Sequence, residues 1–321
     1  MIRAIAITGP TASGKTALSI ALAKRLSAEI ISADSMQIYK RMDIGTAKAT
    51  PAEQSAVRHH LIDLIEPNES YSVECWRDAA MAAARDITSR SLLPIFVGGT
   101  GLYINSLTRL GQSEIPASDP EYRERILEGI KTSEDIDALW QRLNSVDPES
   151  ASAIHKNNLK RVIRALEIYD KTGIPKTVLD RRSTECEGDI DLVHITLDFH
   201  DRELLYSRID KRVGMMLEEG LILEVESLYR EGMLPEGSTA AQAIGYKELR
   251  EYLEGTATLD EAADKIRLAS RRYAKRQLTW FRHNGGACRV FADKEDGGMR
   301  EGEDILSECL AIIEAHFHQD I

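Results

Sequence analysis

The sequence predicts an α/β fold: a parallel β-sheet with helices on both faces, into which an all-helical domain is inserted. Three observations support this class. Short apolar runs alternate with helical stretches in the first third of the chain, amphipathic helical patterns fill residues 118–189, and a further apolar run at 192–197 returns to the sheet. Such alternation favours parallel strands, and ligands of parallel sheets bind at the carboxyl ends of the strands.

The elements of the core follow in order from apolar runs and their turns. Strand-like runs are expected at Ile2–Thr8, 29–33 and 92–97, with helical stretches near 14–26 and 73–90 between them. After the run at 192–197, we expect helices around 202–231, 243–254 and 259–283. The catalytic core is therefore predicted to span 1–117 and 190–321.

Residues 118–189 form the predicted helical insert. Their apolar side chains recur every three or four positions, which is the period of a helix. One stripe consists of Ile136, Leu139, Trp140 and Leu143, and a second of Val162, Ala165, Leu166 and Tyr169.

Composition limits the class of protein. Of the 321 residues, 43% are hydrophobic and 29% are charged, a balance typical of a globular protein with a sizeable core. The chain shows no membrane segment and no secretion signal, and its four cysteines form no CxxC pair. We therefore expect a cytoplasmic protein without a zinc site. The formal net charge of −11 argues, as an average, against nucleic-acid binding.

A glycine-rich segment between the first strand and the first helix carries the strongest chemical signal. It reads Gly9, Pro10, Thr11, Ala12, Ser13, Gly14, Lys15 and Thr16. In this setting the backbone N–H groups surround a phosphate, the lysine neutralises the outer phosphate, and the threonine hydroxyl can hold Mg²⁺. The motif predicts a site for a di- or triphosphate with Mg²⁺ as cofactor. A glycine-rich turn without a ligand is the alternative.

Two further segments place polar groups just past strand ends. Asp34 could act as a general base, as a carboxylate directed at a metal ion, or as an aspartate that caps a turn. In the second segment, Gly98, Gly99 and Gly101 surround Thr100. These glycines suggest a close approach of the backbone to a ligand, with the Thr100 hydroxyl as a donor. A flexible turn is the alternative there.

One part of the chain departs from the acidic average. Residues 265–282 contain no acidic side chain and seven basic ones, which are Lys265, Arg267, Arg271, Arg272, Lys275, Arg276 and Arg282. Thr258 and Glu261 have the spacing of a capping box, which places this stretch on one helix. A shorter basic run comprises Lys156, Lys160, Arg161 and Arg164. Both runs are candidate polyanion sites, and a solvated helix face is the alternative.

Eight segments, in order, resemble the tRNA dimethylallyltransferase (tRNA isopentenyltransferase) family. They are 9–16, 32–39, 44–48, 59–63, 97–103, 164–167, 243–248 and 275–282. The resemblance implies a P-loop NTPase-like core. It also implies transfer of a five-carbon allylic group from dimethylallyl diphosphate to N6 of adenine 37, beside the anticodon of tRNA. No zinc-finger extension like that of some eukaryotic relatives is visible, which indicates a bacterial-type enzyme.

The resemblance also implies roles for individual residues. Residues 9–16 hold the diphosphate, Asp34 is the catalytic base, and Thr100 and Arg123 contact the reacting centre and the tRNA. The residues around the target adenine are Asp34, Ser35, Met36 and Gln37. Further tRNA-contacting segments are Lys160, Arg161, Val162, Ile163 and Arg164; Gln242, Ala243, Ile244, Gly245, Tyr246 and Lys247; and Lys275, Arg276, Gln277, Leu278, Thr279, Trp280, Phe281 and Arg282.

The implied partners are tRNA, gripped by the insert and the basic stretch, and dimethylallyl diphosphate. We expect no membrane partner and a monomer.

This chemistry explains the residue types. The exocyclic amine of adenine is a poor nucleophile because its lone pair is delocalised, so a carboxylate such as Asp34 that accepts its proton makes the attack feasible. The departing diphosphate needs positive charge and hydrogen-bond donors, which Lys15, Mg²⁺ at Thr16 and the Thr100 hydroxyl would supply. Arg208 and Arg212, one helical turn apart, are either further diphosphate contacts or an exposed helix pair.

Other functions remain open from the sequence. A small-molecule P-loop kinase and an enzyme that prenylates free AMP would both use the phosphate loop, but neither needs the basic stretch at 265–282. A non-catalytic RNA-binding NTPase would not need Asp34. The adjacent His59 and His60 lack a third ligand at metal spacing, so we expect them to pack and hydrogen bond.

Overall fold

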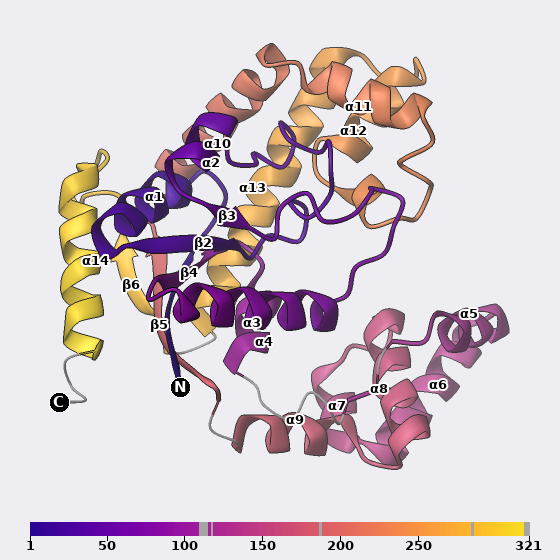
Figure 1. The fold of residues 1–321 in the computed structure, drawn as a ribbon. Coiled ribbons are helices and arrows are strands. Elements are labelled where there is room, and N and C mark those ends of the chain that lie inside the picture. Colours follow the sequence, from indigo (N-terminus) through magenta and orange to yellow (C-terminus); the bar gives the residue numbers. More distant parts are fainter. Residues whose placement is uncertain (109–114, 117, 186–187, 284–285, 318–321) are drawn as a thin grey trace. The chain divides into compact units, whose positions relative to one another are not determined.

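Six parallel strands, from the N-terminal part of the chain and from residues 190–291, form one sheet (Figure 1). The computed structural model describes residues 1–108, 115–116, 118–185, 188–283 and 286–317. Within them the strand order is β3-β2-β4-β1-β5-β6, and each neighbouring pair is parallel, which confirms the predicted sheet. The strands are β1 (Ile2–Thr8), β2 (Ala28–Ser32), β3 (His59–His60), β4 (Leu93–Gly98), β5 (Ile190–Asp198) and β6 (Cys288–Phe291).

The inner strands read as apolar runs because both faces of the sheet are covered. Ile5, Ile7 and Ile95 are fully buried, and strands buried on both faces lose the alternation of apolar and polar residues. The edge strands β3 and β6 were not predicted. β3 has only two residues, both histidines, and β6 begins with the exposed Cys288 and Arg289. Edge strands this short and polar give no apolar run to recognise.

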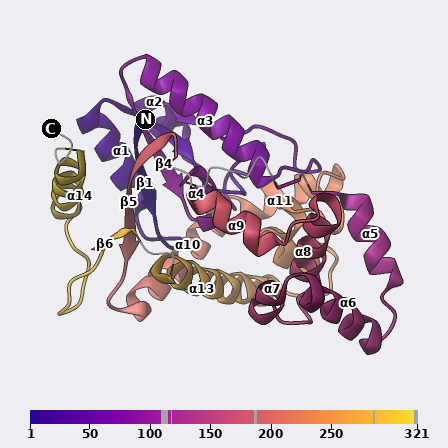
Figure 2. The same cartoon turned by 90° about the horizontal axis from the view of Figure 1, so that it is seen from below.

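The helices of the first unit, Met1–Asn105 with Ile190–Ile321, cover both faces of the sheet. Helices α1 and α14 pack together on one face, and α3 lies on the other (Figure 1, Figure 2). On the α3 face Trp76 stacks on Tyr103 with 4.4 Å between ring centroids. None of the described helices is long and apolar enough to cross a membrane. The helices are α1 (Lys15–Leu26), α2 (Pro51–Ala56), α3 (Val73–Ser89), α4 (Gly101–Thr108), α10 (Arg202–Glu218), α11 (Leu221–Arg230), η2 (Ala240–Gln242), α12 (Tyr246–Leu253), α13 (Leu259–His283) and α14 (Gly302–Phe317).

Helix α13, with 25 residues, joins two apolar cores. Near its start Ile266 packs in a cluster with α10, α11 and α12, and further along Ala274 and Leu278 pack in the core of the sheet. The predicted capping box is present: the Glu261 N–H donates to Thr258 Oγ1 at 3.3 Å, and the Thr258 N–H donates to Glu261 Oε2 at 2.8 Å. The basic stretch therefore lies on one helix that also supports the sheet.

The second unit, Ser106–Asp189, is helical. Leu143, Val162, Ala165 and Leu166 from the two predicted stripes form its buried core. The unit begins at Ser106, within α4, whereas the sequence predicts a start at residue 118, where the first turn signal lies. Residue 117 lies outside the described residues. Its helices are α5 (Pro120–Gly129), α6 (Ser133–Val146), α7 (Pro148–Ala153), α8 (Leu159–Thr172) and α9 (Lys176–Glu185).

A half-buried histidine makes the stability of the fold sensitive to acid. His194 on β5 places Nε2 2.9 Å from Oγ1 of Thr8, the last residue of β1. Burial lowers the pKa of His194 to about 4, whereas the pKa of histidine in an unfolded chain is about 6.5. Between these values the unfolded chain binds more protons than the folded one, so stability falls as the pH is lowered.

We predict that His194→Gln flattens this dependence. Wild type should lose about 1.5 kcal/mol more free energy of unfolding than the variant when the pH falls from 6.5 to 5, because only wild type carries this titration. Urea unfolding at both pH values measures the difference. Identical losses in the two proteins would contradict the prediction.

Candidate active site

Residues 9–14 of the glycine-rich segment form the loop between β1 and α1, at the carboxyl end of the central strands, and Lys15 and Thr16 begin α1. Gly9 and Gly14 adopt positive φ angles of 143° and 93°, which favour glycine. A Cβ on Gly9 would also lie 2.8 Å from the Leu197 carbonyl oxygen. The loop holds Lys15 so that its Nζ donates to the Pro10 carbonyl at 2.6 Å.

A cavity of about 680 Å³ lies against this loop, and every residue that lines it belongs to the first unit. Loops that follow β1, β2 and β4 form one side, and residues of α10, the η2–α12 segment and α13 form the other. The predicted residues that line it are Thr11, Ala12, Ser13, Gly14, Lys15, Thr16, Asp34, Ser35, Met36, Gln37, Arg208, Arg212, Gln242, Ala243, Ile244, Gly245, Lys247, Arg276 and Gln277. The fold thus joins sequence segments that lie far apart.

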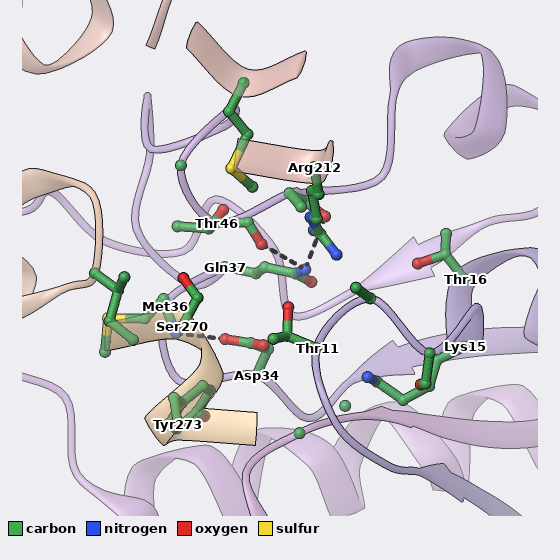
Figure 3. A pocket seen from close by; sticks show the side chains of 18 of the residues that line it. Thr11, Lys15, Thr16, Asp34, Met36, Gln37, Thr46, Arg212, Ser270 and Tyr273 are labelled. Atoms are coloured by element: carbon green, nitrogen blue, oxygen red, sulfur yellow. Dashed lines mark hydrogen bonds between the residues drawn. The ribbon is translucent and has the colours of Figure 1, made fainter. Parts of the chain in front are cut away.

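Asp34, Lys15 and Arg212 are among the charged residues that line the cavity (Figure 3). Burial raises the pKa of Asp34, and the cations Lys15 and Arg212 act in the opposite direction. Burial lowers the pKa of Lys15 to about 7, with repulsion from Arg212 adding to the effect. Burial also lowers the pKa of Arg212, although Asp34 partly offsets this. The cavity therefore pairs a strong proton acceptor with two poorly solvated cations that an anionic ligand would stabilise.

Hydrogen bonds fix the segment that carries Asp34. Asp34 Oδ1 accepts from the Met36 N–H at 2.9 Å. The Gln37 amide is engaged inside the protein, because Ser32 Oγ donates to its Oε1 at 2.9 Å and its Nε2 donates to the Ala47 carbonyl at 3.2 Å. Asp34 is thus held in place, and the Gln37 amide contacts protein atoms rather than facing outward.

Thr100, at the start of α4, is brought to the same segment. Its Oγ1 accepts from the Ser35 N–H at 3.1 Å and lies 3.4 Å from Ser35 Oγ, to which it donates. Thr100 therefore contacts Ser35, the residue that follows Asp34, although Thr100 and Asp34 lie on loops after different strands.

The glycines around Thr100 allow close packing of protein segments, and Gly98 and Gly99 also line the cavity, so their approach to a ligand stays a prediction. A Cβ on Gly98 would lie 2.1 Å from the Ala33 carbonyl oxygen. A Cβ on Gly99 would lie 2.1 Å from Gln277 Nε2, and one on Gly101 would lie 1.9 Å from Trp280 Nε1. Helix α13 and the end of β2 occupy the space, so larger residues would push these elements apart.

The basic stretch on α13 is less positive than its sequence suggests. Acidic groups that mostly lie on other elements neutralise four of its seven cations: Lys265 pairs with Glu251, Arg267 with Asp264, Arg271 with Asp210, and Arg282 with Asp198. In the part of the chain that the structure describes, Arg272, Lys275 and Arg276 have no such partner. Arg276 instead lies over the Tyr273 ring at 5.6 Å.

Arg282 and its apolar neighbours on α13 hold the helix against the rest of the fold. Asp198, only 1% exposed, accepts hydrogen bonds from Arg282 at 2.7 Å and 3.0 Å and from Arg289 at 2.9 Å. Leu278 and Phe281 are buried in the core. Lys275, Arg276 and Thr279 are exposed, and Trp280 is half-buried against Gly101. Only part of the predicted segment is thus open to RNA.

The predicted tRNA-contacting residues of the second unit also divide into buried or paired side chains and exposed cations. Glu167, fully buried, pairs with Arg123 at 3.2 Å and with Arg164 at 3.0 Å. Val162 and Ile163 are buried, so they are core residues rather than surface contacts. Lys160 and Arg161 are exposed cations on α8.

Two side chains escaped sequence reasoning. Glu224 on α11 accepts from the N–H groups of Asp43, Ile44 and Gly45 at 2.8–3.1 Å and from the Tyr246 hydroxyl at 2.5 Å, so it anchors the loop that carries Thr46 to the cavity. Tyr273 lines the cavity beside Asp34 (Figure 3). Both residues reach the site only when folding brings distant segments together, so no local sequence pattern predicts their position.

His59 and His60 hydrogen bond as predicted. His59 Nδ1 lies 2.8 Å from the Val57 carbonyl oxygen, and His60 Nε2 lies 2.7 Å from Glu29 Oε2. Among the described residues, no group of three His, Cys, Asp or Glu side chains could hold a metal ion.

Comparison with known proteins gives a consistent picture. The family model described as IPP transferase matches residues 37–284, and the model described as isopentenyl transferase matches residues 2–65. A tRNA dimethylallyltransferase of Halalkalibacterium halodurans is 49% identical, with 87% of this chain and 88% of the relative covered. One from Caldanaerobacter subterraneus subsp. tengcongensis is 45% identical, with 88% and 89% covered.

Solved structures agree. The full-length tRNA isopentenylpyrophosphate transferase of Bacillus halodurans is 42% identical, with a TM-score of 0.69 over 100% of this chain and 99% of that one. A eukaryotic dimethylallyltransferase acting on tRNA is 28% identical, with a TM-score of 0.83 over 100% of this chain and 80% of that one. The chain therefore belongs to the IPP transferase family, the family of the tRNA dimethylallyltransferases.

Proposed function

We propose that this protein transfers the dimethylallyl group from dimethylallyl diphosphate to N6 of adenine 37 in tRNA and releases diphosphate. The observation that carries the proposal is the cavity that Asp34, Lys15 and Arg212 line together beside the phosphate loop, where both cations influence the pKa of Asp34. It offers a proton acceptor for the nucleophile and positive charge for the leaving group. The relatives are named tRNA dimethylallyltransferases, which favours this reaction over a small-molecule kinase or an AMP prenyltransferase.

Asp34 is the proposed general base. N6 attacks the allylic carbon, the C–N bond forms, the C–O bond to diphosphate breaks, and the N6 proton passes to the Asp34 carboxylate. Burial raises the pKa of Asp34, which makes it a stronger acceptor than an exposed aspartate, while Lys15 and Arg212 favour its ionised form. The Met36 N–H orients the carboxylate.

The phosphate loop and α10 are the proposed diphosphate site. Ser13 Oγ is buried and lacks a hydrogen-bond partner among the described residues, which a phosphate oxygen would satisfy. Lys15 and Arg212 would gain the counter-charge that burial denies them. Arg208 Nε donates to the Ala12 carbonyl at 2.9 Å, so this arginine steadies the loop in addition to adding positive charge.

Mg²⁺ is the proposed cofactor, and Thr16 is the residue that would hold it. Thr16 lies in the first turn of α1 and lines the cavity. Its hydroxyl is a hard oxygen donor, and Mg²⁺ sites commonly take few protein ligands, with phosphate oxygens and water filling the other positions. The donor set therefore fits an ion held jointly with the diphosphate, where it would neutralise charge on the leaving group.

The exposed cations are the proposed RNA contacts. Arg272, Lys275 and Arg276 on α13 lack acidic partners in the described chain, and Lys160 and Arg161 are exposed on the second unit. These groups can neutralise phosphates of the anticodon stem-loop without a positive net charge on the protein. One copy of the chain contributes the whole cavity, so we propose a monomer that works in the cytoplasm, where tRNA is processed.

The direct test is product analysis. The purified protein is incubated with Mg²⁺, dimethylallyl diphosphate and unmodified tRNA, and the nucleosides are then analysed by mass. We expect adenosine to gain the mass of one dimethylallyl group in place of a proton. An unchanged nucleoside pattern, or phosphate transfer instead, would overturn the proposal.

Asp34→Asn tests the base. The amide keeps the size of the side chain but cannot accept the N6 proton, so the single-turnover rate should fall by about 10²–10⁴-fold. Affinity for pyrophosphate and for the stem-loop should stay within a few-fold of wild type. A single-turnover rate close to wild type would remove Asp34 from the mechanism.

Lys15→Met tests the diphosphate site. Loss of one charge-assisted hydrogen bond should weaken binding of inorganic pyrophosphate roughly 10–100-fold, measured by calorimetry, with RNA affinity little changed. Lys24→Met removes an exposed lysine from the last turn of α1 and serves as the control. Equal pyrophosphate affinity in both variants would refute the assignment.

Arg276→Ala and Arg282→Ala form a matched pair on α13. Arg276 is free to neutralise a phosphate, so its loss should weaken stem-loop binding and reduce the slope of log affinity against log salt by roughly 0.7–0.9. Arg282 pairs with the buried Asp198, so its loss should leave the slope unchanged and lower the free energy of unfolding by at least about 1 kcal/mol.

Binding titrations at several salt concentrations and urea unfolding separate the two effects. A salt slope that falls for Arg282→Ala but not for Arg276→Ala would reverse the roles assigned to these arginines.

A further inference from the structure

Gln277 joins three parts of the cavity wall. Its Oε1 accepts from the N–H of Thr11 in the phosphate loop at 2.9 Å. Its Nε2 donates to the Gly99 carbonyl at 3.1 Å, in the loop that carries Thr100. One amide on α13 therefore ties the phosphate loop to the loop after β4.

The fit around this amide is close. Gln277 is 5% exposed, and a Cβ on Gly99 would lie 2.1 Å from its Nε2. Its acceptor and one of its donors are used by backbone groups, so the amide is engaged within the protein. Gln277 therefore contributes to RNA binding through the helix that carries it rather than through its own amide.

The turn of α13 that holds Gln277 also carries cations without acidic partners in the described chain, and one of them, Arg276, lines the cavity as well. Lys275 and Arg276 directly precede Gln277, and both are exposed. Because neighbouring residues point in different directions around a helix, RNA on the outer face and the phosphate loop on the inner face meet the same turn of α13. The position of this turn therefore affects the binding of both RNA and diphosphate.

We propose that Gln277 is a positioning residue that couples RNA binding on the outer face of α13 to diphosphate binding at the phosphate loop. The inference rests on the proposed function. RNA neutralises the cations that repel one another on this turn and fixes the helix, and the Gln277 amide then fixes Thr11 and Gly99. The diphosphate then binds a loop that is already ordered, so its binding loses less conformational entropy. By the same linkage, bound diphosphate raises the affinity for RNA.

The test is a binding cycle on the full-length protein. Calorimetry measures the affinity for inorganic pyrophosphate with Mg²⁺, in the absence and in the presence of a saturating unmodified anticodon stem-loop. In wild type the stem-loop should raise pyrophosphate affinity at least about fivefold. In Gln277→Met, which removes both hydrogen bonds at similar volume, the ratio should fall to about one while stem-loop affinity stays within a few-fold of wild type.

Lys265→Gln is the matched control, because it removes another anchor of α13, the ion pair with Glu251, and leaves the amide in place. It should keep the wild-type ratio. If Gln277→Met fails to fold, Gln277→Glu replaces it: the carboxylate still accepts from Thr11 but cannot donate to Gly99, so the ratio should again fall.

The outcomes separate this inference from the proposed function. A wild-type ratio of one, or an undiminished ratio in the folded Gln277 variant, overturns the coupling while modified nucleoside still forms. An equal fall in the ratio for Lys265→Gln also overturns it, because general loosening of α13 would then explain the effect. Absence of both stem-loop binding and modified nucleoside in wild type overturns the proposed function itself.

Discussion

Burial of unlike charges around one cavity is the constraint on which the site depends. Asp34, Lys15 and Arg212 each lose solvation there, and burial is the largest influence on the pKa of each. Their mutual attraction recovers part of that cost, and an anionic ligand would recover more. The pKa values in such a site depend on the distances between the charges, so its loops must keep a fixed conformation. The hydrogen bonds of Met36 and Thr100 to the segment around Asp34 meet that need.

Helix α13 provides much of this support. Its start packs among α10, α11 and α12, its later turns pack in the core of the sheet, and Arg282 ties it to Asp198 on β5. Gly99 and Gly101 let it approach the loop after β4, where any side chain would collide with Gln277 or Trp280. The helix that presents cations to solvent is therefore part of the wall of the cavity, and a change on one side is felt on the other.

Local sequence patterns predicted the features that are themselves local. The apolar run of β1, the phosphate loop and the capping box at Thr258 each depend on residues a few positions apart, and each appears as predicted. The pairing of Arg282 with Asp198, and the capture of loop 43–45 by Glu224, depend on residues that folding brings together from distant positions. Sequence spacing contains no such information, and the same limit hides the packing of Gly99 and Gly101 against Gln277 and Trp280.

The pairing of cations also explains how an acidic protein can bind RNA. Formal net charge sums all 321 residues to −11, but charges separated by more than about 8–10 Å are largely screened at physiological ionic strength. Lys265, Arg267, Arg271 and Arg282 are neutralised by nearby carboxylates, so they add little to the local potential. Arg272, Lys275 and Arg276 have no acidic partner in the described chain, so no paired carboxylate offsets their charge. Cations of this kind can contact RNA phosphates although the chain as a whole is acidic, because the interaction depends on the charges within the screening distance.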